Sequence, residues 1–223
     1  MALALFDLDH TLLNGDSDYL WGQYLAARGD VDTAHHAREN HRFFEQYRAG
    51  TLDIHAYFHF TLGPIAAADP AQLKQWLADF LESVIKPIIP QRSRERLAQH
   101  RRNGDELVII TATNSVITRP IATELGVANL LATEPRIDGG RYGRDIEGPP
   151  CFREGKIDKL AQWLSRRNQT PDWASSYFYS DSHNDIPLLS KVGNPVAVNP
   201  DPKLRTHAET QGWPIISLRD STH

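Results

Sequence analysis

The sequence predicts an α/β fold in which a parallel sheet is interrupted by an inserted, all-helical segment. After residue 86, short apolar runs typical of buried strands alternate with stretches of helical spacing. Residues 15–86 show helical spacing and contain no convincing strand. We therefore expect a core domain formed by residues 1–14 and 87–223 and a helical cap domain formed by residues 15–86.

The first strand is expected over residues 2–6, an apolar run that ends at Asp7. Gly15 then breaks the chain, and the insertion begins with apolar residues at helical spacing. Asp69 and Pro70 form a good helix start, with an N-cap and a proline in the first turn. Further helices in the insertion are expected over 34–49, 51–61 and 70–84.

The remainder of the chain alternates between the two kinds of element. Strands are expected over 107–110, 177–179, 195–198 and 214–218, and helices over 91–102, 118–125, 156–166 and 185–190. Gly139 and Gly140 form a hairpin-turn signal. This order is typical of a Rossmann-like parallel sheet, in which ligands gather at the carboxyl ends of the strands.

Composition narrows the classes of partner. The net charge is −4 and the sequence pI is about 6.2, so the chain lacks the basic character of a nucleic-acid-binding protein. No uninterrupted apolar stretch reaches membrane-spanning length. The single cysteine, Cys151, excludes an internal disulfide and suits a reducing, cytoplasmic location. The oligomeric state is not indicated.

Polar side chains follow three of the expected strands. Asp7, Thr111 and Asp181 each come directly after an apolar run, so we expect them at one edge of the sheet. Asp9 follows Asp7 by two residues, and buried carboxylates at a strand end are costly unless they are paired. Mg²⁺ is a natural partner because it takes oxygen ligands. The alternative is a pair of turn-forming aspartates.

Three further groups carry candidate chemistry. Thr111 and the following Ala112 offer a hydroxyl and backbone N–H groups to a phosphoryl oxygen, or simply form a helix cap. Lys156 stands at the start of an expected helix, where a cation is mildly unfavourable, although most such lysines are merely exposed. The run from Asp181 to Asp185, with Asn184 between, suits cation coordination or an Asx-rich loop.

Taken in order, these groups resemble the four motifs of the haloacid dehalogenase (HAD) superfamily of phosphohydrolases. The motifs are Asp-x-Asp-x-Thr from Asp7, the strand-end Thr111, the helix Lys156 and the acidic loop from Asp181. The position of the helical insertion resembles the C1 cap of the phosphoserine phosphatase-like branch, subfamily IB. One departure is Ser180, where many relatives carry glycine.

The resemblance implies a magnesium-dependent phosphatase for a small phosphorylated metabolite. Asp7 would be the nucleophile that forms an aspartyl-phosphate, and Asp9 the general acid and base. Thr111, Ala112 and Lys156 would bind the phosphoryl group. Mg²⁺ would be held by Asp7, Asp9 (through its backbone carbonyl) and Asp181, with Asn184 and Asp185 in support.

The substrate is less constrained than the chemistry. Phosphoserine, histidinol phosphate and other small phosphomonoesters all stay open. Asp16 stands where the resembling branch places a carboxylate that meets a substrate amine, and Arg42 and Arg48 are candidates for a substrate carboxylate. A dehalogenase would need neither Asp9 nor the acidic loop, and a non-catalytic binding protein would be expected to have lost a motif acid. A phosphomutase uses the same acids and stays an alternative.

Overall fold

The core is a six-stranded sheet in which every neighbouring pair of strands is parallel. The computed structural model describes residues 1–220, apart from the side chain of Arg48. The strand order is β3-β2-β1-β6-β7-β8. The strands are β1 (Leu3–Phe6), β2 (Glu106–Asn114), β3 (Asn129–Thr133), β6 (Tyr177–Ser180), β7 (Asn194–Val198) and β8 (Ile215–Ile216). In this order β1 lies between β2 and β6, so the segments that follow these three strands meet at one edge.

Helices cover both faces of the sheet, as expected for parallel strands. On one face, β1, β2 and β6 pack against α5 (Gln91–Asn103) and α6 (Ser115–Glu124). On the other face they pack against α7 (Glu154–Arg166), α8 (Ile186–Leu189) and α9 (Pro202–Gln211). Alternation along β1 produces this division, because Phe6 belongs to the first hydrophobic cluster and Leu5 to the second.

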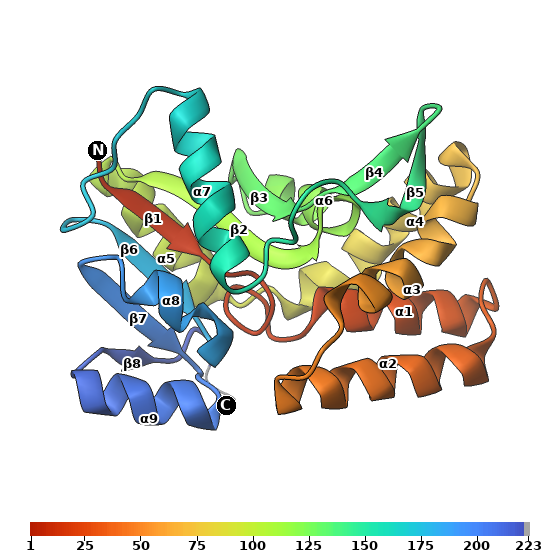
Figure 1. Ribbon diagram of the computed structural model, residues 1–223, viewed down its shortest axis with the longest axis horizontal. Helices are drawn as coiled ribbons and strands as arrows, with labels where there is room; N and C mark the ends of the chain where they lie inside the picture. The colour runs from red at the N-terminus through yellow and green to blue at the C-terminus, as the bar shows by residue number, and fades with distance from the viewer. Residues whose placement is uncertain (221–223) are drawn as a thin grey trace.

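The insertion between β1 and α5 is helical. It contains α1 (Ser17–Arg28), α2 (Thr33–Ala49), α3 (Ile54–Ala67) and α4 (Pro70–Phe80), followed by the short segments η1 (Leu81–Ile85) and η2 (Lys86–Ile88). An aspartate caps the start of each of the four α-helices by accepting backbone N–H bonds from the first turn. Figure 1 shows these helices beyond the carboxyl end of β1.

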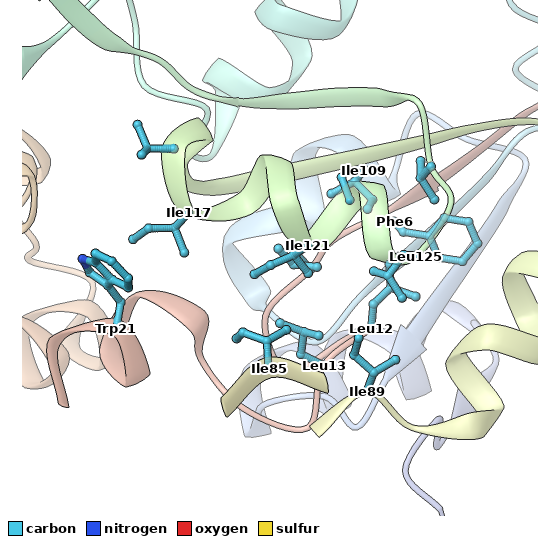
Figure 2. Close-up of a cluster of buried hydrophobic side chains, with 14 of the residues drawn as sticks. Phe6, Leu12, Leu13, Trp21, Ile85, Ile89, Ile109, Ile117, Ile121 and Leu125 are labelled. Atoms are coloured by element: carbon cyan, nitrogen blue, oxygen red, sulfur yellow. The ribbon is translucent and has the colours of Figure 1, made fainter. Parts of the chain in front are cut away.

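The base of the cap is buried together with the core. Leu13, Trp21 and Ile85 belong to the same hydrophobic cluster as Phe6 and Ile109 of the sheet. Figure 2 shows Leu13 and Ile85 beside Ile121 of α6, Leu12 and Ile89 near Leu125, which follows that helix, and Trp21 near Ile117. The chain passes from core to cap after β1 and returns before α5. Burial of apolar surface, worth about 25 cal/mol per Å², stabilises both of these connections.

A hairpin from the core sequence extends over the cap. The strands β4 (Pro135–Asp138) and β5 (Arg141–Ile146) pair antiparallel around Gly139 and Gly140, where the sequence predicts a turn. The hairpin packs on α3, and Arg141 donates a hydrogen bond to the carbonyl of Ala68 at 2.9 Å. Figure 1 shows it reaching towards α4. The cap is thus covered partly by residues outside the helical insertion.

The expected α/β class is confirmed, with local differences. The sequence patterns missed β3 and α9, and β2 continues to Asn114 instead of ending at residue 110. The irregular pairing of β2 with β3 between Ile110 and Asn114 explains the difference, because polar residues there remain extended without a regular ladder. The exact domain boundaries stay a prediction. Within residues 1–220, no helix has the length and hydrophobicity needed to cross a bilayer.

Candidate active site

The carboxyl ends of β1, β2 and β6 open into a cavity between the sheet and the cap. Asp7, Thr111 and Asp181 all line it, so the structure brings together the residues expected at the sheet edge. The cavity has a volume of about 180 Å³. Asp9, Ala112, Lys156, Asn184 and Asp185 line it as well. Residues far apart in the sequence therefore share one cavity.

Lys156 joins two of the acids. Its Nζ lies 2.8 Å from Asp7 Oδ1 and 2.7 Å from Asp185 Oδ2. The lysine is 3% exposed, so this is a buried ion pair and not a surface contact. Burial opposes the charged form of Lys156, but Asp185 and Asp7 outweigh it and raise the pKa of the ammonium. The lysine is thus held as a cation beside Asp7.

Gly155 explains why Lys156 can approach this closely. A Cβ at position 155 would lie 2.1 Å from the backbone oxygen of Pro150, far inside contact distance. Only glycine lets the start of α7 pack against the preceding loop in this way. The close approach of two backbone segments therefore sets where the lysine enters the site.

Asp181 faces Asp7 across the same site. Thr11 Oγ1 donates a hydrogen bond to Asp181 Oδ1 at 3.1 Å. Burial is the largest influence on the pKa of Asp181 and raises it well above its usual range, with further increases from the charges of Asp7 and Asp185. Burial likewise raises the pKa of Asp7 to about 6, against the opposing effect of Lys156. The acids together carry more negative charge than one lysine balances.

Asp9 is held by the start of the cap and by β2. The backbone N–H of Ser17 donates to Asp9 Oδ1 at 2.6 Å, and Thr113 Oγ1 donates to Asp9 Oδ2 at 2.8 Å. Burial and then the charge of Asp16 raise the pKa of Asp9 to about 6. This carboxyl group is therefore oriented by two donors and accepts a proton more readily than an exposed aspartate.

The second motif presents small groups to the cavity. Thr111 Oγ1 accepts a hydrogen bond from the backbone N–H of Thr113 at 3.2 Å, and the carbonyl of Ala112 accepts one from Thr133 Oγ1 at 2.7 Å. Asn114 then caps α6 by accepting from the N–H of Ile117. The irregular end of β2 thus fixes a short polar segment at the cavity wall.

Ser180 supplies a second donor to Asp185. Its Oγ donates to Asp185 Oδ2 at 2.7 Å and accepts from the backbone N–H of Ser182 at 3.1 Å. A glycine at this position would offer neither bond. The serine that departs from the family pattern therefore stabilises the acidic loop and the carboxylate that pairs with Lys156.

The donor set fits a hard divalent cation. Asp7 and Asp181 carry oxygen atoms suited to such an ion; burial and then the charge of Asp7 raise the pKa of Asp181, and a cation between the two would relieve that repulsion. No cluster of three His, Cys, Asp or Glu side chains within the described residues is arranged to hold a metal. A site built from two carboxylates and the backbone carbonyl of Asp9 does not need a third side chain, and it leaves room for the waters that Mg²⁺ retains.

The three specificity candidates have different outcomes. Asp16 lines the cavity and also caps α1 by accepting from the N–H of Tyr19 at 2.9 Å. Arg42 is exposed, pairs with Glu39 at 2.6 Å and does not line the cavity, and its contact with a substrate carboxylate stays a prediction. Arg48 lies on α2, but its side chain falls outside the described residues.

The cap side of the cavity was not predicted from the sequence. It is largely aromatic, because three cap helices and the loop before α7 turn rings toward the site: Tyr19, Phe43, Phe44, Tyr47, Tyr57, Phe58 and Phe152. His10 also lines the cavity, with a positive φ of 56°. On α2, Phe43, Phe44 and Tyr47 follow one another at spacings that favour one helix face. That spacing is the sequence signal from which an aromatic cap wall could have been predicted.

The sequence matches the family of haloacid dehalogenase-like hydrolases over residues 4–190. This chain belongs to the haloacid dehalogenase-like hydrolase family. The matched span contains all four motifs, from Asp7 to Asp185. The expected family and hydrolase class are thereby confirmed, and the assignment of roles to single residues stays a prediction.

Two relatives carry phosphatase names. The HAD chain is 41% identical over 219 residues to a histidinol-phosphatase of Neisseria meningitidis serogroup C, covering 97% of this chain and 99% of that protein. It is 30% identical over 221 residues to a phosphoserine phosphatase of Mycobacterium tuberculosis, covering 98% of this chain and 71% of that protein. Both likenesses extend through core and cap.

Solved structures share the fold. A protein of unknown function from Bordetella pertussis Tohama I is 44% identical, with a TM-score of 0.91 over 97% of this chain and 98% of that one. A substrate-bound phosphoserine phosphatase has a TM-score of 0.69 at 16% identity, over 98% of this chain and 93% of that one. At that identity, the second likeness concerns the fold alone.

One further acid is buried behind the cavity wall. Asp18 is 4% exposed, its Oδ2 accepts a hydrogen bond from the hydroxyl of Tyr57, and no partner within the described residues reaches its Oδ1. Burial raises the pKa of Asp18 to about 7, with further increases from Asp16 and Asp9. The acid joins α1 to α3 beneath the aromatic wall.

We expect Asp18→Asn to remove part of the pH dependence of stability. Between the ordinary pKa of 3.8 and about 7, unfolded Asp18 releases its proton while folded Asp18 retains it. The stability supplied by Asp18 is therefore complete below pH 4 and is lost as the pH rises to about 7, on the order of 3–4 kcal/mol. Urea unfolding at several pH values measures the loss in wild type and variant.

The exposed substitution Asp158→Asn is the matched control and should keep the wild-type pH profile. If the free energies of unfolding of wild type and Asp18→Asn run parallel from pH 4 to pH 8, the buried acid does not titrate in this range.

Proposed function

We propose that this HAD protein is a magnesium-dependent phosphatase that hydrolyses a small phosphomonoester through an aspartyl-phosphate on Asp7. The observation that carries the proposal is the position of Asp7. It lines the cavity, lies 2.8 Å from a buried lysine and interacts electrostatically with Asp9, Asp181 and Asp185. These contacts support a nucleophilic role for Asp7 towards a bound phosphoryl group.

In the first step, a carboxylate oxygen of Asp7 attacks phosphorus and the bond from phosphorus to the substrate oxygen breaks. Asp9 transfers its proton to the leaving oxygen, so an alcohol departs and no alkoxide is released. The raised pKa of Asp9, about 6, supports this role because a general acid must hold its proton near neutral pH.

In the second step, Asp9 is ionised and accepts a proton from a water molecule. The water oxygen attacks phosphorus, the bond to Asp7 breaks, and inorganic phosphate leaves with Asp7 restored. The two donors that fix Asp9, from Ser17 and Thr113, keep the same carboxyl group aimed at the site in both steps. One residue can therefore serve as acid and then as base.

The remaining polar groups of the cavity are proposed to balance the negative charge of the phosphoryl group and of the acids. Lys156 binds phosphoryl oxygens and screens Asp7, and Thr111 and Ala112 offer a hydroxyl and a backbone N–H at the cavity wall. Asp7, Asp181 and the carbonyl of Asp9 would hold Mg²⁺, with Asp185 and Asn184 in support. Mg²⁺ supplies positive charge that neutralises phosphoryl oxygens and favours the anion of Asp7.

The cavity favours histidinol phosphate over phosphoserine as the substrate class. Its cap side is aromatic, which suits a planar ring, and Asp16 offers a carboxylate to a substrate amine. Among the described lining side chains, Lys156 is the only lysine or arginine, and the phosphoryl group occupies it. A substrate carboxylate would therefore lie near Asp16 without a matching cation. The name of the Neisseria relative points the same way.

Phosphate release from a panel of phosphomonoesters tests the reaction. With Mg²⁺ present, we expect release of inorganic phosphate, with histidinol phosphate preferred over phosphoserine. EDTA and Asp7→Asn should each reduce the release to the level of a buffer blank, because one removes the counter-charge and the other the nucleophile. Asp158→Asn, on the exposed face of α7, is the matched control.

Phosphate release that survives EDTA or the loss of Asp7 would contradict the mechanism. Transfer of phosphate to an added alcohol or sugar phosphate in preference to water would instead support the phosphomutase alternative.

Asp16 is the residue to change for substrate preference. Asp16→Asn keeps an oxygen that caps α1 but removes the negative charge. We expect KM for histidinol phosphate to rise about tenfold, as for the loss of one charged contact worth about 1.4 kcal/mol, while KM for p-nitrophenyl phosphate stays unchanged. Initial-rate kinetics on both substrates measure the difference. An equal change on both substrates would remove Asp16 from the amine site.

A further inference from the structure

Arg153 has a backbone conformation that an arginine rarely adopts. It stands directly before α7, with φ of 52° and ψ of −123°, and it makes no side-chain bond that caps the helix. Residues other than glycine are disfavoured at positive φ because the Cβ atom crowds the backbone. A glycine here would relieve the strain, so the arginine side chain must supply something in return.

The side chain of Arg153 connects three segments. Its Nε donates to Asn184 Oδ1 at 3.0 Å, and its Nη2 donates to the carbonyl of Gly50 at 3.2 Å. Asn184 belongs to the acidic loop, and Gly50 closes α2 of the cap. The guanidinium also lies 5.0 Å from the ring centre of Phe152, a residue of the cavity wall.

A second contact links the same end of α2 to the same loop. The Tyr47 hydroxyl lies 2.9 Å from Ser182 Oγ, which also accepts bonds from the backbone and side-chain N–H groups of Asn184 at 3.2 Å. Burial raises the pKa of the Tyr47 hydroxyl, so it stays neutral, and either hydroxyl of the pair can be the donor. Figure 1 shows this end of α2 as the part of that helix nearest the core.

The two contacts join the cap to the core in addition to the apolar cluster at its base. At the base, buried residues such as Leu13 and Ile85 hold the connections. At the end of α2, the hydrogen bonds of Tyr47 and Arg153 contribute to the docking of the cap on the acidic loop. Tyr47, Phe152, Ser182 and Asn184 line the cavity here, so these bonds also fix one of its walls.

We propose that Arg153 is a positioning residue that couples docking of the cap to the geometry of the acidic loop. When Gly50 of the cap is in place, the guanidinium is shared between its carbonyl and Asn184. Asn184 is then fixed beside Asp185, whose carboxylate pairs with Lys156 at 2.7 Å. The role rests on the proposed phosphatase function, because it acts through Asp185 and Lys156 on the group that binds phosphate.

Arg153→Gly separates this role from a purely structural one. It relieves the positive φ while removing the guanidinium, so the melting temperature should equal or exceed that of wild type. We expect kcat/KM for histidinol phosphate to fall at least tenfold, with most of the loss in kcat. Arg153→Lys, which keeps one charged donor, should recover part of the loss.

Asn168→Gly is the matched control. Asn168 also has a positive φ, 50°, but it is exposed at the end of α7 and bonds neither cap nor loop. This variant should keep wild-type kinetics. Tyr47→Phe, alone and combined with Arg153→Gly, completes a cycle in which the two losses should be non-additive, because both contacts hold the same junction.

Hydrogen exchange needs no substrate and keeps the test independent of the phosphatase function. In Arg153→Gly, amides of residues 47–52 and 181–185 should exchange at least tenfold faster than in wild type. If wild type hydrolyses no phosphomonoester but this exchange still increases in the variant, the proposed phosphatase function is contradicted, while the proposed coupling between the cap and the acidic loop is supported. Unchanged exchange together with wild-type kcat/KM, or a loss of activity explained by a lower melting temperature, would overturn the role of Arg153.

Discussion

The buried contact of Lys156 with Asp7 and Asp185 is the interaction on which the site depends. Unit charges 4 Å apart interact by about 4 kcal/mol at an effective dielectric near 20, so a cluster of buried aspartates repels itself strongly. Lys156 balances part of that charge at 2.8 Å and 2.7 Å. Burial is the main reason that the pKa values of Asp7 and Asp181 are raised, and the charge of Asp185 raises both further. This charge distribution supports the proposal that the site binds Mg²⁺ together with a phosphoryl group.

The fold provides that contact by bringing distant segments to one edge. Asp7 follows β1, Asp181 follows β6, and the two strands pair directly in the sheet. Lys156 comes from α7 on one face, where Gly155 allows close packing on the loop before it. From the cap side, the backbone N–H of Ser17 donates a hydrogen bond to Asp9. The cap therefore contributes both the aromatic wall and one of the bonds that orient the expected acid and base.

The sequence predicted the polar half of the site well and the cap half poorly. Asp7, Thr111 and Asp181 could be placed together because strand ends in a parallel sheet meet at one edge. The sequence did not show whether the Arg42 side chain points towards the site or pairs with Glu39, one helical turn away on the same helix. The contacts of Arg153 and Ser180 depend on how loops far apart in the chain meet, which no local pattern records. The strand β3 was missed, and β8 was predicted too long, because short strands carry little periodicity.

Thermal unfolding with and without Mg²⁺ tests the charge balance most directly, since it needs no substrate. A cation that binds between Asp7 and Asp181 stabilises the folded state by RT ln(1 + [L]/Kd), so the melting temperature of wild type should rise with Mg²⁺ concentration. Asp181→Asn should show little or no rise, and Asp158→Asn should behave as wild type. An equal rise in wild type and Asp181→Asn, or no rise in either up to tens of millimolar Mg²⁺, would contradict the proposed site.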